Sequence, residues 1–299
     1  MGKELFIDPA LSRKSKLVDV SLELVDGWPL PSVVEISESG TCNRKCVFCP
    51  RSAPGFPDKK EFISNQLLEK LALELSHYGY EGIFLFSGFV EPMLDKNIYK
   101  KIGLVRSHLP KAKIEMVTNG DVLTKHRLSK LFDSGLSTIL ISVYDSAKDA
   151  ERFLQMCISA GLNEKDFVIR HRYLSEEQTF GITINNRAGM MSSAEYSIPT
   201  PSEPLKLPCH YPHYTFFMDY LGDVLLCPHD WGKKKIIGNM FQSTFKEIWL
   251  SKIFIKSREM LANSDRRMSP CGECDVKGNL MGASHVSAWK EFGTMGAKK

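Results

Sequence analysis

The chain has 299 residues, of which 43% are hydrophobic and 25% charged, enough for one large domain or a medium domain with a small one. Its formal net charge is only +4, and the lysines and arginines are scattered rather than gathered into a basic stripe. This distribution argues against a nucleic-acid partner. No run of about 18 apolar residues exists, so we expect no membrane-spanning segment and no membrane partner.

The opening residues and the cysteine content bear on the compartment. The stretch MGKELFIDPALSRKSK lacks the apolar core of a secretion signal, so we expect a cytoplasmic protein. In a reducing compartment, the eight cysteines are better candidates for metal ligands than for disulfides.

Short apolar runs alternate with helical patterns through the first two thirds of the chain. Strands are expected at residues 33–39, 82–88, 113–120, 137–144 and 167–174, with a further strand at 180–185. Helices are expected between them at residues 65–79, 95–108, 123–135 and 147–161. This alternation predicts an α/β fold with a parallel sheet, in which the units are too few for an eight-fold barrel. We therefore expect a partial, open (β/α)6 barrel.

The pattern changes after residue 190. A Ser- and Pro-rich stretch follows and reads as a linker. Beyond it we expect a hairpin turning at residues 221–223 and a helix over 243–261, with Thr244 and Glu247 placed for a capping box. The last 25 residues show little pattern.

These elements divide the chain into four expected parts. They are an N-terminal extension (1–32), the partial barrel (33–190), the linker (191–208), and a small C-terminal domain of hairpin and helix with its tail (209–299).

Three cysteines, Cys42, Cys46 and Cys49, directly follow the first expected strand. Sites in parallel sheets are built after the carboxyl ends of the strands. A four-iron cluster normally takes four cysteines, one for each iron. Three thiols would leave one iron open to bind a small molecule and pass it an electron. A zinc knuckle is the alternative, although a structural zinc site takes four ligands.

The spacing Cys-x3-Cys-x2-Cys after the first strand resembles the signature of the radical S-adenosylmethionine (SAM) enzymes. The resemblance implies a [4Fe–4S] cluster whose open iron chelates the amino and carboxylate groups of SAM. It implies that one-electron reduction cleaves SAM to methionine and a 5′-deoxyadenosyl radical, which abstracts hydrogen from a substrate. It also implies an external one-electron reductant such as flavodoxin or ferredoxin. Phe48 matches the aromatic residue usual before the third cysteine.

After the second strand, the sequence resembles the segment that binds the SAM amino group in this family. Ser87, Gly88 and Glu91 match a Ser-Gly-x-Gly-Glu-Pro version of it, while Val90 stands where a glycine is expected. The resemblance places Glu91 near the SAM ammonium. A solvated glutamate before a turn proline is the alternative.

The next two strand ends also carry residues that the resemblance assigns to SAM. Thr118 and Asn119 follow the third strand and Ser142 lies in the fourth, at places that contact the ribose or methionine end of SAM. Turn chemistry alone accounts equally well for Asn119 before a glycine.

Arg170 and Arg172 share one face of the fifth strand, with His171 on the other face. A charged pair within a barrel strand is costly unless it has partners. We expect the SAM carboxylate or a polar substrate to partner these arginines, and we take both as candidate catalytic residues that hold the substrate. The alternative is that this strand end is exposed to solvent. Residues 185–189 resemble a turn near the active site in relatives with a C-terminal iron–sulfur domain.

The second group of cysteines lies in the last third of the chain. Cys209 and Cys227 flank a glycine with the spacing Cys-x12-Gly-x4-Cys, and Cys271-x2-Cys274 follows the expected helix. The arrangement resembles the shorter, twitch form of SPASM domains, which implies one auxiliary [4Fe–4S] cluster held by four cysteines. By spacing alone, the four cysteines could equally hold zinc. Cys157 is left over and is expected to be a buried structural cysteine.

The twitch arrangement resembles that of 2-deoxy-scyllo-inosamine dehydrogenases and of an aminoglycoside epimerase. It implies oxidation of a small polar substrate (a carbohydrate, cyclitol or nucleotide-like alcohol) with the auxiliary cluster as electron acceptor. No Gly-x-Gly-x-x-Gly fingerprint for a hydride carrier is present. Epimerisation, peptide modification and a non-enzymatic iron–sulfur electron carrier stay open as alternatives.

Dehydrogenation needs a proton acceptor near the substrate hydroxyl. Four residues beside the second group of cysteines are candidates for this role or for substrate contacts, with surface placement as the alternative: His210, His213, His229 and Asp230.

Overall fold

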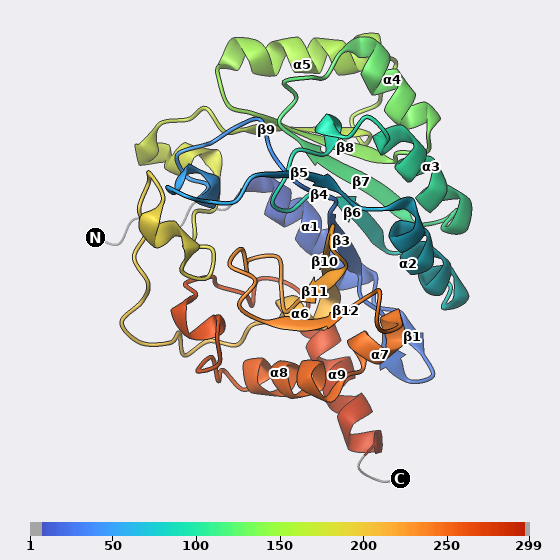
Figure 1. Cartoon of the computed structure of the whole chain (residues 1–299), viewed down its shortest axis with the longest axis vertical. Helices are drawn as coiled ribbons and strands as arrows, with labels where there is room; N and C mark the ends of the chain where they lie inside the picture. Colours follow the sequence, from blue (N-terminus) through green and yellow to red (C-terminus); the bar gives the residue numbers. More distant parts are fainter. Residues whose placement is uncertain (1–7, 297–299) are drawn as a thin grey trace.

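The structure is a computed structural model that describes residues 8–296. Residues 1–7 of the expected N-terminal extension and residues 297–299 of the expected tail lie outside this range. The centre of the fold is an eight-stranded sheet in the order β12-β11-β10-β3-β6-β7-β8-β9 (Figure 1). Its strands are β3 (Val33–Ser37), β6 (Ile83–Phe86), β7 (Lys113–Thr118), β8 (Thr138–Val143), β9 (Phe167–His171), β10 (Thr215–Asp219), β11 (Asp223–Leu225) and β12 (Ile236–Asn239).

Five of these strands form the expected parallel sheet. β3, β6, β7, β8 and β9 pair in parallel and in chain order. Four helices connect them and cover one face of the sheet, as Figure 1 shows: α2 (Asn65–His77), α3 (Ile98–His108), α4 (Lys125–Asp133) and α5 (Ala147–Ser159). The expected β/α alternation is confirmed, with element ends that differ from the prediction by a few residues.

Side chains alternate between the two faces of these strands because successive Cβ atoms point to opposite sides. In β3, Val34 and Ile36 are fully buried in the hydrophobic core shared with the helices. Val33 and Glu35, which alternate with them along the strand, line a cavity on the other face. The apolar positions of α2 close the core from outside, where each buried leucine contributes about 1.5–3 kcal/mol.

The expected strand at residues 180–185 is wrong. Residues Glu176–Gly181 form a 3-10 segment, η3, and Thr179 and Phe180 both have a φ of 52°. That left-handed backbone is incompatible with the extended conformation of a strand. The sixth parallel strand is instead β10, which pairs with β3 on the opposite side of the sheet from β9.

The hairpin of the C-terminal part is confirmed and is continuous with the barrel sheet. β10 and β11 are antiparallel, and Gly222 in the turn has a φ of 82°, which favours glycine. Because β10 also pairs with β3, one sheet runs from the first strand of the barrel into the C-terminal segment.

The expected helix over residues 243–261 is two helices, α7 (Phe245–Trp249) and α8 (Lys252–Ala262). The capping box of Thr244 and Glu247 begins the first, as predicted. Ser251 caps the second by accepting a hydrogen bond from the backbone of Phe254, which accounts for the break.

The region expected to show little pattern contains α9 (Ala283–Gly296), which packs on the core through Trp289 and a buried His285. At the other end of the chain, α1 (Pro9–Val20) packs against Val33 and Ile83 through Val18. The remaining elements are short: β1 (Leu24–Val25), β2 (Trp28–Pro29), β4 (Ser39–Gly40), β5 (Lys59–Phe62), η1 (Pro50–Ser52), η2 (Pro92–Leu94), η4 (Met190–Ser193), α6 (Tyr211–Tyr214) and η5 (Cys271–Glu273). Within residues 8–296, no helix has the length and apolar character needed to cross a membrane.

Candidate active site

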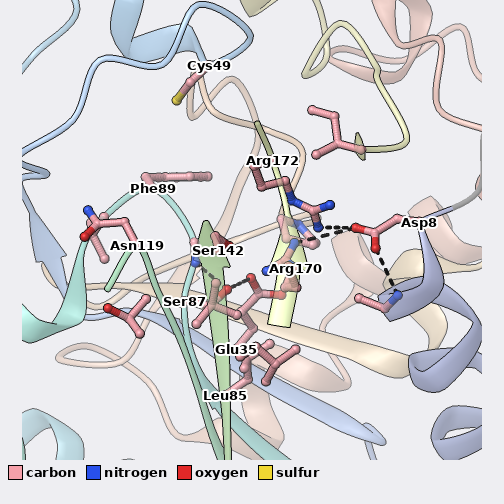
Figure 2. Close-up of a pocket in the computed structure, with 18 of the residues that line it drawn as sticks. Asp8, Glu35, Cys49, Leu85, Ser87, Phe89, Asn119, Ser142, Arg170 and Arg172 are labelled. Carbon is pink, nitrogen blue, oxygen red and sulfur yellow. Dashed lines mark hydrogen bonds and ion pairs between the residues drawn. The ribbon is translucent and has the colours of Figure 1, made fainter. Parts of the chain in front are cut away.

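A cavity of about 330 Å³ opens on the inner face of the parallel strands. Its wall is formed by inward-pointing residues of β3, β6, β7, β8 and β9, by α1, and by the loop that carries the first three cysteines. The C-terminal half also contributes to the wall, through Arg187, Tyr211, Pro228, His229 and Trp231. Figure 2 shows residues of the cavity from several strands converging on one space. The cavity therefore lies where the carboxyl ends of the parallel strands meet, which is the usual place for a site in such a sheet.

Cys42, Cys46 and Cys49 all line this cavity, as the sequence led us to expect. Burial, followed by the neighbouring Cys49 and Cys42, raises the pKa of the Cys46 thiol to about 12. The three thiols are thus close enough to influence one another. Soft thiolates grouped in this way are the donors that iron–sulfur clusters take.

The cysteine loop is tied to the next strand ends by polar contacts. Arg44 pairs with Asp121 after β7 at 2.5 Å and with Asp145 after β8 at 2.6 Å. Asn119 donates a hydrogen bond of 2.7 Å from its Nδ2 to Oδ1 of Asn43. Asn119 therefore lies beside the cysteine loop, and its side-chain amide holds that loop in place.

Glu91 is 1% exposed and lies against the same strand end. Its Oε1 accepts hydrogen bonds from the Met93 backbone at 2.9 Å and from Thr118 Oγ1 at 2.7 Å, and its Oε2 accepts one from the Asn119 backbone at 2.6 Å. Burial raises its pKa, and these hydrogen bonds oppose the shift. Since each carboxylate oxygen accepts about two hydrogen bonds, Oε2 keeps room for one further donor. The alternative of a solvated glutamate is excluded by this burial.

Ser87 and Gly88 follow β6 at the cavity wall. Ser87 donates a hydrogen bond of 2.7 Å to Oε1 of Glu35, visible in Figure 2. Gly88 has a φ of 88°, and a Cβ there would lie 2.8 Å from the Cβ of Ser37. The position thus requires glycine for both its backbone and its space.

Phe48 and Ser142 also lie in the cavity wall. The Phe48 ring stacks on Tyr144 at a centroid distance of 6.1 Å and packs against Phe180 at 5.0 Å. Ser142 is buried on β8, opposite Arg170 in the pairing with β9. Both residues therefore line the same cavity as the first three cysteines.

Arg170 and Arg172 point into the cavity, while His171 between them is exposed and contacts Tyr173. Their partner is Asp8, just before α1, which sequence reasoning missed. Arg172 donates to Asp8 and to the carbonyl of Gly181, so this guanidinium is largely committed to the protein. Arg170 approaches Asp8 only to 3.8 Å, and its buried Nε has no hydrogen-bond partner among the described residues. Arg170 is therefore the better candidate to contact a ligand.

The second group of thiols comes together from three segments. Cys209 precedes α6, Cys227 follows β11, Cys271 begins η5 and Cys274 follows it. Burial raises the pKa of Cys227 well above its usual range, followed by the effects of the other three thiols. The four thiols thus form one neighbourhood. Within residues 8–296, no three His, Cys, Asp or Glu side chains lie close enough to hold a single metal ion.

Of the four candidates beside these thiols, only His229 lines the cavity. His210 contacts the Met281 carbonyl at 2.9 Å, His213 is buried, and Asp230 accepts hydrogen bonds from the backbones of residues 234 and 235. His229 is therefore the one of the four that stays a candidate proton acceptor or substrate contact.

Arg187 lies between the two groups of thiols. Its Nη1 is 3.3 Å from Nδ1 of His229, and its guanidinium lies over the Trp231 ring at 5.8 Å. Its charge lowers the pKa of Cys49, against the larger effect of burial. The turn at residues 185–189 thus reaches the cavity, as its resemblance to related turns implied.

The cavity has further charged residues that sequence reasoning missed: Asp8, Arg13, Lys14, Glu35 and Glu115. Glu35 carried a signal, since it is the one charged residue of β3, and it occupies an inward position. Asp8 and Arg13 carried none, because nothing in the local pattern shows that α1 folds against the interior of the sheet.

The comparison with protein families agrees with this geometry. The Radical SAM superfamily matches residues 36–185, which is half of the chain, and the SPASM iron–sulfur cluster-binding domain matches residues 209–275. The chain belongs to the radical SAM superfamily. It is a radical SAM enzyme, and its two domains take SAM and two [4Fe–4S] clusters.

Individual relatives extend the likeness over most of the chain. The S-adenosyl-L-methionine-dependent 2-deoxy-scyllo-inosamine dehydrogenase of Niallia circulans is 28% identical over 82% of this chain and 92% of its own length. The crystal structure of BtrN in complex with AdoMet and 2-DOIA superposes with a TM-score of 0.69 and 26% identity, covering 83% of this chain and 94% of that one. A GTP 3′,8-cyclase of Staphylococcus carnosus is 32% identical, but over 40% of this chain and 35% of its own.

Proposed function

We propose that this enzyme is a radical SAM dehydrogenase that oxidises a ring alcohol of the cyclitol type. The observation that carries the proposal is the position of the cavity, whose wall includes both the first three cysteines and the loop after Cys227. A substrate held there contacts the radical-generating side and the auxiliary side at once. The similarity to the Niallia circulans dehydrogenase extends over both parts and supports the same class of reaction.

The reaction removes a carbinol hydrogen atom, a hydroxyl proton and one electron, and leaves a carbonyl. When bound, SAM with the first cluster supplies the hydrogen-abstracting radical, and the second cluster supplies an electron acceptor. The free acceptor position on Glu91 Oε2 suits the SAM ammonium, and the Phe48 ring shields the cysteine loop. The Arg170 side chain lines the cavity and approaches Asp8 only to 3.8 Å, so its guanidinium is the candidate contact for a substrate oxygen.

The position of Cys157 favours dehydrogenation over epimerisation. An epimerase would need a thiol that returns hydrogen to the opposite face of the substrate. Cys157 is fully buried in the core formed by α5 and the sheet, and burial raises its pKa to about 11. It is the one cysteine outside the two groups and is therefore a structural residue.

The expected partners follow from this chemistry. A small polar substrate fits a cavity of about 330 Å³, and an external one-electron donor such as flavodoxin or ferredoxin would supply the reducing electron. Seven thiols that serve as cluster ligands require a reducing compartment, which supports the cytoplasm.

The test is an anaerobic assay of the reconstituted enzyme with dithionite, SAM and 2-deoxy-scyllo-inosamine. We expect 5′-deoxyadenosine and a carbonyl product in equal amounts. The Cys42→Ala/Cys46→Ala/Cys49→Ala variant should form neither, and Cys157→Ala should behave like the wild type. An epimer without a carbonyl product, or no 5′-deoxyadenosine with any cyclitol, would overturn the proposal.

A further inference from the structure

Arg266 lies in the loop between α8 and η5, among the segments that carry the C-terminal cysteines. It is 2% exposed, and its guanidinium donates three hydrogen bonds. All three acceptors are backbone carbonyls at 2.8–2.9 Å: those of Leu207, Pro208 and Val276. Pro208 directly precedes Cys209, and Val276 follows Cys274 by two residues. The side chain of Arg266 therefore joins two of the segments that carry thiols.

The positive charge of Arg266 has no carboxylate partner, although its N–H groups are hydrogen-bonded. Among residues 8–296, no ion pair within 4.0 Å includes it. The three acidic residues of the segment 265–275 have other partners: Asp265 pairs with Arg267 at 2.8 Å, Glu273 with Lys234 at 2.5 Å, and Asp275 with the Asn186 backbone at 2.8 Å. Carbonyl dipoles satisfy the donors but do not neutralise the charge, and a buried charge without a counter-charge is costly.

A second buried arginine shows that this fold can compensate such a charge in another way. Arg258 of α8 is 2% exposed and also forms no ion pair within the described part of the chain. Its guanidinium lies 3.7–4.0 Å from the centroids of three rings, those of Trp249, Phe254 and Trp289. The electron-rich ring faces attract that cation. Arg266 has no such ring contact among the described residues, so its counter-charge has to come from another group.

The thiols are the remaining candidates. Burial raises the pKa of the Cys209 thiol, and the charge of Arg266 is the next influence and lowers it. Arg266 acts in the same direction on Cys271 and Cys274, whose pKa values burial also raises. The backbone agrees with this proximity, because a Cβ at Gly272 would lie 3.4 Å from the Arg266 carbonyl oxygen. Arg266 is therefore close to three of the four thiols that we assign to the auxiliary cluster.

From this arrangement we propose that Arg266 is the counter-charge of the auxiliary cluster and raises its reduction potential. Four thiolates make such a cluster anionic, and one-electron reduction adds a further negative charge. A buried cation beside it therefore stabilises the reduced form. This assignment rests on the proposed function, in which the second cluster supplies the acceptor for the electron that remains after the substrate loses a hydrogen atom and a proton. Arg266 does not line the cavity, so it acts on the reaction only through the cluster.

The direct test is an anaerobic redox titration followed by electron paramagnetic resonance. The Cys42→Ala/Cys46→Ala/Cys49→Ala background isolates the auxiliary cluster. Arg266→Met removes the charge, whereas Arg266→Lys keeps the charge and gives up the planar fork of donors. We expect the methionine variant to lower the equilibrium constant for one-electron reduction about tenfold or more, which is a fall of about 59 mV in midpoint potential. The lysine variant should stay close to the parent.

Arg267→Gln is the matched control. It removes a positive charge at the next position, where the side chain is 82% exposed and water and salt screen it. We expect its midpoint potential to equal that of the parent. An equal fall in this control and in Arg266→Met would overturn the proposal, because the loss of any nearby charge would then have the same effect.

Iron per chain in the same samples covers the case in which a variant does not assemble. Loss of iron in Arg266→Met with full iron in Arg266→Lys would support the proposal, because the charge would then be what the cluster needs. Equal losses of iron or of potential in the two variants would overturn it, since the hydrogen bonds rather than the charge would be responsible. A parent potential in the fully loaded methionine variant would overturn it as well, and so would a parent background that binds no iron.

A measurement with substrate separates this proposal from the proposed function. In the otherwise unchanged enzyme, Arg266→Met should still form 5′-deoxyadenosine but less carbonyl product, so that the ratio of the two rises above the wild-type value. The proposed function fails if the wild type forms no carbonyl product. The role of Arg266 fails on the potentials, which are measured without any substrate, so the two failures are distinguishable.

Discussion

Arg13 of α1 holds Glu115 of β7 through two hydrogen bonds across 102 residues of sequence, at 3.0 Å between Nη1 and Oε2 and at 2.5 Å between Nη2 and Oε1. Glu115 is 3% exposed, so this bidentate pair fixes an N-terminal helix to the inside of the sheet. The floor of the cavity depends on that attachment, because α1 contributes several residues to it.

We expect Arg13 and Glu115 to make strongly coupled contributions to the free energy of unfolding. Arg13→Met leaves Glu115 buried and without its partner, and should lower the free energy of unfolding by about 3 kcal/mol. The double variant Arg13→Met/Glu115→Met removes both charges and should recover much of that loss. Urea denaturation of the two single variants and the double variant measures the coupling. Additive losses would show that the contact contributes little.

The carboxylate of Glu91 should govern SAM binding without governing cluster content. Glu91→Gln keeps the shape of the side chain but removes its charge, so affinity for SAM should fall about 10–100-fold. Equilibrium dialysis of the reconstituted protein gives this number, and iron per chain in the same samples should match the wild type. Wild-type affinity in the variant would remove Glu91 from the SAM site.

His285 should make the fold sensitive to acid. Its Nε2 lies 2.6 Å from Ser32 Oγ at the start of β3, and burial lowers its pKa from 6.5 to about 4. As the pH falls through 6.5, His285 becomes protonated in the unfolded chain but stays neutral in the native state until about pH 4. The free energy of unfolding should therefore fall, by about 2 kcal/mol between pH 7 and pH 5 for this residue alone.

A His285→Gln variant checks this sign. Its glutamine cannot titrate in this range, so its denaturation free energy should depend less steeply on pH than that of the wild type. Burial also lowers the pKa of His213, and the variant should keep that share of the slope. Identical slopes in the two proteins would contradict the assignment.

The sequence predicted the parts of the fold whose signals are local. The β/α alternation, the two groups of cysteines and the inward positions of Arg170 and Arg172 follow from spacing along the chain. Residues 180–185 alternate apolar and polar side chains like a strand. The left-handed backbone at Thr179 and Phe180 prevents the extended conformation that a strand requires.

A local sequence pattern could not predict the contacts between segments that are far apart in the chain. β10 pairs with β3 across about 180 residues of sequence, and α1 reaches the cavity from the far end of the chain. Residues 283–296 form a helix because Trp289 and His285 find buried partners, His213 and Ser32, in distant segments. Such partners decide the conformation through tertiary packing, which propensity does not show. Glu35 could have been singled out as the charged residue between the apolar Val34 and Ile36.

The central claim is that the chain carries two separate clusters on the two groups of thiols, and iron and sulfide per chain after anaerobic reconstitution test it most directly. We predict about eight irons in the wild type, by the four-iron count for each cubane. About four should remain when Cys42, Cys46 and Cys49 are replaced by alanine, and about four when Cys209, Cys227, Cys271 and Cys274 are replaced. About four irons in the wild type and none in the first variant would contradict the claim, because the second group of thiols would then hold no iron–sulfur cluster.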